Sequence, residues 1–388
     1  MRRAPRGLSL GAVALALTLF AGCARDATPP SDPRDVIQLR WIKAYPDESR
    51  DDVETGLLWG LSLAGAQLPR GQHVIEWQGD RLTLDLARAQ VVEGTQSAWR
   101  EFLAALQGSG EYRRQGAVDI GRFMAIMLGD ASRYYALSGA PSDYSIARAR
   151  YRFDERPAAI VTSGVALGSR RIDLSLADTA RQLAFVGFEG HGSLVDGSFV
   201  PHEMELVDVM PNGQLRFALY DLEGRLKVGA SRNLTRAGKP AKCMWCHESG
   251  LMVSLVDYPG VSGFYDRGGF DARIEQHRRL LRDYREGVDT QIEYDNRQDH
   301  TFAELLYMSF EEPSRERVAR EWDVTVERAT ELLRGKPTHA QTERPQLGDR
   351  LYRREDVDAL APYAVLPAPR DIREPDEQVS AGVLEARK

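Results

Sequence analysis

The chain contains little cysteine and no long apolar run. Among its 388 residues there are only three cysteines, Cys23, Cys243 and Cys246. That number is too small for a secreted scaffold framed by disulfides. The longest mostly apolar stretch, Leu8 to Phe20, has 13 residues, whereas a helix that spans a membrane needs about 20. The remaining composition, 43% hydrophobic and 28% charged, predicts a globular protein with a substantial core.

The sequence also lacks an excess of positive charge and the common nucleotide-binding and hydrolase motifs. Its formal net charge is −6, which argues against a basic surface for nucleic acid. It contains no G-x-G-x-x-G fingerprint, no phosphate-binding loop and no G-x-S-x-G elbow. The sequence therefore gives no indication of nucleic-acid binding, dinucleotide binding or serine-hydrolase chemistry.

The first 22 residues have the pattern of an export signal. Three arginines precede the apolar run, which has the length of a signal-peptide core. The segment Leu19-Phe20-Ala21-Gly22-Cys23 resembles the lipobox of bacterial lipoproteins, although the family usually has leucine where this chain has Phe20. The resemblance implies cleavage before Cys23 and lipid attachment to it. The alternative is an ordinary signal peptide cut near Ala21, with Cys23 as a bystander.

Lipid attachment at Cys23 would make the protein a membrane-anchored one. Two or more acyl chains anchor a protein stably, at about 0.8 kcal/mol per buried methylene. Residues 23–34 are polar and rich in proline, which predicts a flexible tether. Ala24 follows the cysteine, which in this family implies sorting to the outer membrane. We therefore expect an exported protein at the periplasmic face of a bacterial membrane.

Residues 35–235 combine helical and strand periodicity. Apolar residues recur at helical spacing within residues 53–61, 99–106 and 120–127. Later the period changes to two, and Pro211-Asn212-Gly213 separates two alternating runs, which predicts a hairpin. Consecutive short strands with tight turns indicate an antiparallel sheet. The predicted class is therefore α+β, with an N-terminal domain of antiparallel sheet and helices whose role the sequence does not reveal.

One polar cluster in this half has residues of the metal-ligating types. Glu189, His191, His202 and Glu203 lie near one another in sequence, and His and Glu side chains on facing strands can bind a metal. Glycines around His191 and the proline before His202 favour turns instead. A turn with surface histidines is the preferred interpretation of these residues.

The segment Cys243-Met244-Trp245-Cys246-His247 is the motif that carries chemistry. Two thiols at this spacing can each add to one vinyl group of a porphyrin, and the following imidazole can ligate the iron. The five residues resemble the haem-attachment motif of c-type cytochromes. The resemblance implies one covalent haem c, thioethers at Cys243 and Cys246, and His247 as the proximal iron ligand. The alternatives are a dithiol–disulfide redox centre, a zinc site and a chance match.

Residues 236–340 are predicted to form a mainly α-helical haem-binding domain. Gly238 and Pro240 predict that residues 236–242 lead into the motif as a loop. For the distal iron ligand we favour Met308, whose separation from His247 is typical of the family. His277, His300, another methionine and an open position remain alternatives, and Met308 also reads as a core residue. Residues 341–388 are predicted to be a partly disordered C-terminal extension.

These features together predict a membrane-anchored, single-haem c-type cytochrome that carries electrons, rather than a catalyst. Its partner would be a redox protein with a basic docking face, because this chain is acidic. One alternative is a haem enzyme or gas sensor with an open sixth coordination site. Another is a lipoprotein that binds a ligand or partner, with haem as an accessory.

Overall fold

The computed structural model describes residues 31–160, 162–163, 165–251, 255–257 and 260–369. The predicted signal peptide and Cys23 lie outside these residues. The described residues form a single packing unit. Helix α1 (Arg50–Leu63) packs on α10 (Arg297–Glu311), and α8 (Pro240–His247) packs on β10 (Leu215–Asp221). Elements on both sides of the boundary predicted at residue 235 are thus in contact.

A small sheet forms from the first strands of the chain. Its order is β2-β3-β1-β4, with β1 antiparallel to β3 and parallel to β4. Leu82 and Leu84 are buried on one face of β3, as the alternating pattern predicts. The strands are β1 (Val36–Arg40), β2 (Ile75–Gln78), β3 (Arg81–Asp85) and β4 (Val118–Asp119).

Helices pack closely around this sheet. In α1 a capping box joins Ser49 and Asp52, which satisfies backbone N–H groups at the helix start. A side chain at Gly56 would collide with the backbone of α10, so glycine allows the two helices to approach. The predicted helices are confirmed as α1, α3 (Gln96–Gln107) and α5 (Ile120–Gly129); the others here are α2 (Leu86–Ala89), α4 (Gly110–Gln115), α6 (Ala131–Ser138) and α7 (Tyr144–Ala149).

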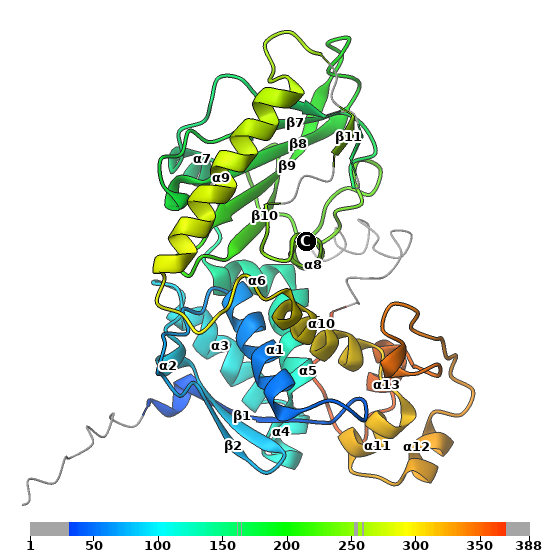
Figure 1. The fold of residues 1–388 in the computed structure, drawn as a ribbon. Coiled ribbons are helices and arrows are strands. Elements are labelled where there is room, and N and C mark those ends of the chain that lie inside the picture. Colours follow the sequence, from blue (N-terminus) through cyan, green and yellow to red (C-terminus); the bar gives the residue numbers. More distant parts are fainter. Residues whose placement is uncertain (1–30, 161, 164, 252–254, 258–259, 370–388) are drawn as a thin grey trace, which may run out of the picture. The chain divides into compact units, whose positions relative to one another are not determined.

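A five-stranded antiparallel sheet follows, in the order β10-β9-β8-β7-β5. The predicted hairpin joins β9 to β10, and Gly213 in its turn has φ +88°. Helix α9 (Arg267–Gly287) crosses one face of this sheet, where Phe270 and Ile274 pack on Leu174 (Figure 1). The strands are β5 (Ala158–Ile160), β7 (Arg170–Leu174), β8 (Ala184–His191), β9 (Val200–Val209) and β10; β6 (Thr162–Ser163) pairs separately with β11 (Leu255–Asp257).

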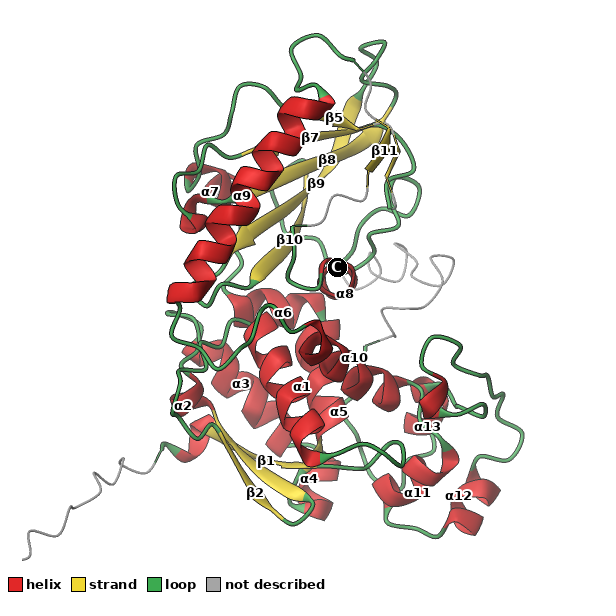
Figure 2. Cartoon of the chain, viewed as in Figure 1, coloured by secondary structure: helices red, strands yellow, loops and turns green. Residues whose placement is uncertain are grey.

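After α10 the chain forms only short helices in the part that the structure describes (Figure 2). Asp323 takes a left-handed conformation with φ +54° and ends α11. The elements are α11 (Arg315–Trp322), α12 (Val326–Leu332) and α13 (Arg354–Asp358), and the 3₁₀ helices of the chain are η1 (Pro33–Asp35), η2 (Ala180–Gln182) and η3 (Pro345–Leu347). The mixture of largely antiparallel sheets and helices confirms the α+β class.

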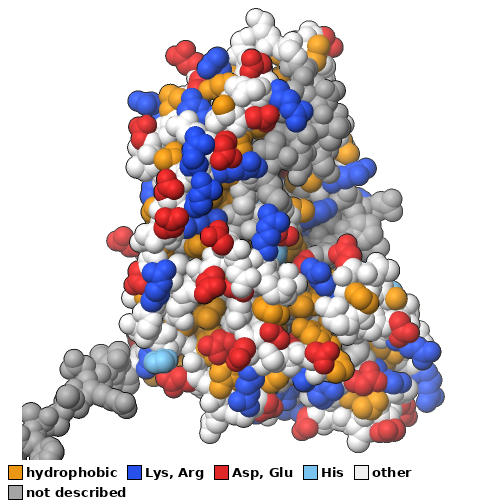
Figure 3. Space-filling view, in the orientation of Figure 1, with side chains coloured by type: hydrophobic (Ala, Val, Ile, Leu, Met, Phe, Trp, Pro, Cys, Tyr) orange, Lys and Arg blue, Asp and Glu red, His pale blue; other side chains and the backbone are white. Residues whose placement is uncertain are grey.

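A buried network of charges fastens these C-terminal helices to α4 and α5. Glu321 accepts from Arg354 at 2.9 Å and from Arg317 at 3.0 Å, and all three side chains are almost fully buried. Buried ions are tolerated only when they are paired and hydrogen-bonded. The other members are Glu111, Asp119, Arg122 and Asp358. Acidic and basic side chains are instead interspersed over the surface in Figure 3.

We predict that Glu321→Gln lowers the free energy of unfolding by about 3 kcal/mol, because it leaves buried guanidinium groups without their charged partner. Urea unfolding would measure this change. The matched control is Glu331→Gln on α12, whose pair with Arg328 is exposed and is expected to contribute less than about 1 kcal/mol. Equal effects of the two substitutions would contradict this assignment.

Candidate haem-attachment site

The C-x-x-C-H motif lies within helix α8, not after a loop as predicted. The loop ends at Lys239, and Pro240 is the first residue of the helix. Proline is suited to this position because its fixed φ is helical and the N–H that it lacks would have no partner there. The prediction of a loop over residues 236–242 was therefore wrong for its last three residues.

Helical spacing places the three chemical side chains of the motif on one face. Cys243, Cys246 and His247 stand at positions i, i+3 and i+4, which are neighbours on a helix surface. Cys246 is exposed, and Cys243 and His247 are half-buried. Met244 and Trp245 are 1% and 7% exposed. The helix thus buries its apolar residues and leaves both thiols and the imidazole on the side away from Trp245.

Trp245 fixes the opposite face of α8 against α10. Its ring centroid lies 5.3 Å from that of His300 and 5.6 Å from that of Tyr307, in edge-on arrangements. Edge-to-face aromatic contacts of this kind add about 0.5–1.5 kcal/mol beyond burial. Because the rear of α8 is held in this way, the direction of its thiol-bearing face is also set.

The orientation of the His247 ring is set by a backbone contact. Its Nδ1 lies 3.1 Å from the carbonyl oxygen of Gly250. A carbonyl can only accept, so Nδ1 carries the proton and Nε2 keeps its lone pair. This is the arrangement that metal-ligating histidines use. The ring of Phe217 on β10 packs beside it, with centroids 5.3 Å apart.

Burial favours the neutral forms of Cys243 and His247. Burial lowers the pKa of His247, the Gly250 hydrogen bond opposes that shift, and the Arg170 charge adds to it. Burial also raises the pKa of the Cys243 thiol, with a further contribution from Glu205. The imidazole is thus neutral at pH 7, as iron ligation requires, and Cys243 is a protonated thiol.

Two residues after the helix take an uncommon backbone conformation. Glu248 and Ser249 have φ +43° and +62°, which costs of the order of 1 kcal/mol or more for each non-glycine residue. Contacts around Ser249 hold the turn. Its hydroxyl donates to Gln214, and its carbonyl accepts from Arg285 at 2.6 Å. This turn brings the Gly250 carbonyl back to His247.

Arg170 is a cationic side chain near the motif that sequence reasoning missed. It lies on β7, pairs with Glu189 and reaches Glu205 at 3.3 Å. Its Nε is buried and makes no hydrogen bond within the described residues. No pattern in the sequence indicated that Arg170 lies near the motif.

The structure does not bring the predicted distal ligand into the motif's surroundings. Met308 is fully buried in a cluster with Leu305, Leu347 and Leu351, which includes no residue of α8. Met308 as a distal ligand therefore stays a prediction without a supporting contact.

The two histidine alternatives are also placed away from the thiol-bearing face. His300 contacts Trp245, on the rear of α8. His277 on α9 is fully buried against Phe185, with centroids 5.3 Å apart. Both of its ring nitrogens are enclosed by protein. Neither histidine contacts His247 among the described residues.

The polar cluster in the second sheet is occupied by ion pairs. Glu189 pairs with Arg170, and Glu203 pairs with Lys227. His191 and His202 are exposed, with ring centroids 6.0 Å apart. In the part of the chain that the structure describes, no group of three or more His, Cys, Asp or Glu side chains is placed to hold a metal ion.

Comparison of the chain with family models, with curated proteins and with solved structures finds no match. Across the described residues, no helix combines the length and the apolar character needed to cross a membrane. The site is therefore interpreted from its own residues.

The enclosed imidazole of His277 makes the stability of the fold depend on pH. Burial, reinforced by the Arg273 charge, lowers the pKa of His277 from 6.5 to about 4. The unfolded chain then binds more protons than the folded one between these values, so stability falls as the pH drops from 6.5 to 4. The loss approaches roughly 3 kcal/mol at the lower limit.

Urea unfolding between pH 7 and pH 4 would measure this loss in the parent protein and in His277→Phe. We expect the variant to lose clearly less stability over this range. The control is His73→Gln, because the side chain of His73 is exposed and its replacement should leave the pH-dependence unchanged. A His277→Phe variant with the parent's full pH-dependence would contradict the assignment.

Proposed function

We propose that this protein is a membrane-anchored c-type cytochrome that holds one covalent haem on α8 and transfers electrons. The observation that carries the proposal is the shared face of Cys243, Cys246 and His247, together with the Gly250 contact that leaves Nε2 of His247 free. A dithiol redox centre or a chance C-x-x-C would not need the imidazole to be held in this tautomer.

Each residue of the motif has a defined part in this proposal. The S–H of Cys243 and that of Cys246 would each add across a vinyl C=C bond, with sulfur on one carbon and hydrogen on the other. Nε2 of His247 would donate its lone pair to iron. The Gly250 carbonyl would hold the ring. Bound haem supplies a one-electron ferric–ferrous couple.

The surroundings of α8 suit an electron carrier. Trp245 and the turn at Glu248 and Ser249 hold the attachment face in one position. A proximal ligand with a fixed orientation would keep the rearrangement between oxidation states small. Cys23, outside the described residues, would bear the lipid anchor. The acidic net charge of −6 favours a redox partner with a basic docking face, whose on-rate falls with salt.

We predict that the protein, exported from a bacterium with haem-attachment machinery, gives a pyridine haemochrome spectrum of the two-thioether type with one haem per chain. Cys246→Ser should shift the absorption band of the haemochrome to the position typical of one thioether, because one vinyl group then stays unreacted. His247→Ala should lose the proximal ligand and most of the bound haem.

Cys23→Ser is the matched control for these variants. It removes the proposed lipid site but no haem contact, so we expect full haem content in a protein released from the membrane. A parent protein without thioether-linked haem would refute the proposal, as would a Cys246→Ser variant with two thioethers. Membrane release of Cys246→Ser instead of Cys23→Ser would contradict the assigned roles of the cysteines.

A further inference from the structure

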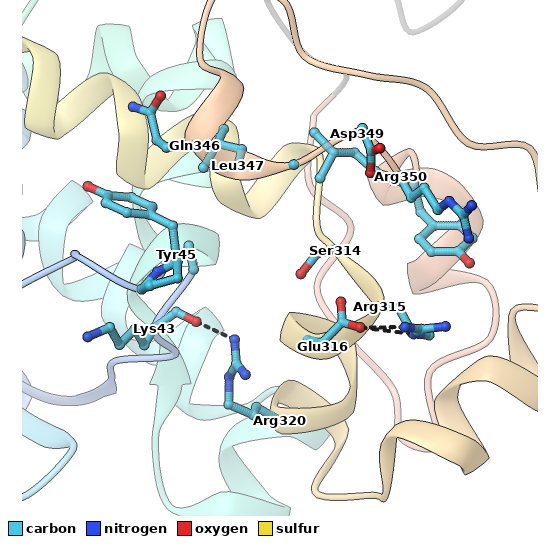
Figure 4. Close-up of a pocket in the computed structure, with 15 residues that line it drawn as sticks. Lys43, Tyr45, Ser314, Arg315, Glu316, Arg320, Gln346, Leu347, Asp349 and Arg350 are labelled. Atoms are coloured by element: carbon cyan, nitrogen blue, oxygen red, sulfur yellow. Dashed lines mark hydrogen bonds and ion pairs between the residues drawn. The ribbon is translucent and has the colours of Figure 1, made fainter.

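A second site lies away from the haem motif. A cavity of about 640 Å³ opens between residues 43–46, the start of α11 and residues 346–352 (Figure 4). Its volume falls within the range of small-molecule sites, about 300–1,000 Å³. None of its lining residues belongs to α8 or to the five-stranded sheet.

The floor of this cavity is apolar. Leu347 and Leu351 line it and are 5% and 1% exposed. They pack on Met308 beneath, while Ala44 and Tyr45 join the same cluster from the other wall. Met308 thus supports the cavity floor in this structure. An apolar ligand body placed on these residues would lose contact with water, which is favourable.

The rim of the cavity is cationic in an otherwise acidic protein. Four basic side chains and two carboxylates line it, which leaves a formal excess of two positive charges. One basic residue, Arg315, is neutralised by Glu316 at 2.6 Å. The carboxylate of Asp349 is the second acid of the rim.

The other three cations lack a carboxylate partner. Arg320 donates to the carbonyl oxygen of Lys43 at 2.5 Å, which orients its guanidinium but does not neutralise it. Among the described residues, no carboxylate lies within ion-pairing distance of Lys43, Arg320 or Arg350. In Figure 4, Lys43 and Arg320 lie on one side of the opening and Arg350 on the other. Burial and the charge of Arg317 lower the pKa of Arg320, and the carboxylates of Glu316 and Glu48 oppose that shift.

We propose that this cavity binds an amphipathic organic anion, a carboxylate, sulfonate or phosphate group joined to an apolar body. The apolar body would rest on Leu347 and Leu351. The anionic head would lie in the opening, between Lys43 and Arg320 on one side and Arg350 on the other. Ser314 at the start of α11 offers a hydroxyl beside them. Guanidinium groups that form no ion pair recognise such heads through charge-assisted hydrogen bonds. This inference does not depend on the haem proposal.

The test uses 8-anilinonaphthalene-1-sulfonate, which joins an aromatic body to a sulfonate. Equilibrium dialysis against the full-length protein, with free probe measured by fluorescence in the protein-free chamber, avoids interference from a bound chromophore. We expect one site per chain, and affinity that falls as salt is raised. Decanoate should compete for this site, whereas decanol, which has the apolar body without the charge, should not.

Variants of the rim decide the location of the site. Arg320→Gln keeps a donor for the Lys43 carbonyl but removes the charge, and Arg350→Gln removes an exposed charge. Each should weaken binding about fivefold, the effect of losing about 1 kcal/mol from a partly exposed ion pair. Arg328→Gln, a charge change on the exposed face of α12, is the matched control and should bind as the parent does.

Three results would overturn the proposal: no binding at millimolar probe, equal binding by Arg320→Gln, Arg350→Gln and the parent, or competition by decanol as strong as that by decanoate. Because the melting temperature of each variant is measured alongside, a loss of binding in an unfolded Arg320→Gln protein is recognised, and Arg350→Gln then decides.

Discussion

The anchoring of Trp245 against α10 is the interaction on which the rest of the candidate site depends. A helix of eight residues has little stability of its own, so its orientation comes from what it buries. With Trp245 and Met244 packed inward, helical spacing leaves the two thiols and His247 together on the remaining face. The turn at Glu248 and Ser249 then adds the Gly250 carbonyl, which sets the tautomer of the imidazole.

The second sheet contributes the electrostatic surroundings of this helix. Phe217 on β10 lies beside His247. The charge of Arg170 on β7 favours a lower pKa for both His247 and Cys243. These residues belong to the half of the chain that precedes the motif. The first half is therefore part of the candidate site, and α8 packs on β10 across the boundary predicted at residue 235.

Local patterns in the sequence predicted several elements, because near neighbours dictate each of them. Apolar spacing predicted α3 and α5, and Asn-Gly predicted the β9–β10 turn. The contacts that define the site were not predictable in this way. Pro240 was interpreted as a breaker although it begins a helix, and no local pattern signals two successive non-glycine residues with positive φ. The partners Arg317 and Asp119 are 198 positions apart. No local pattern links them, so each looks like an ordinary surface residue in the sequence.

The central claim is that Cys243 and Cys246 hold a haem through two thioethers, and one mass measurement tests it directly. Trypsin should release residues 243–267 from the exported protein, because Lys242 and Arg267 flank this segment. The account predicts that this peptide carries the mass of one covalent haem, with neither cysteine open to alkylation. The same peptide with two alkylatable thiols, or with an internal disulfide, would contradict the account.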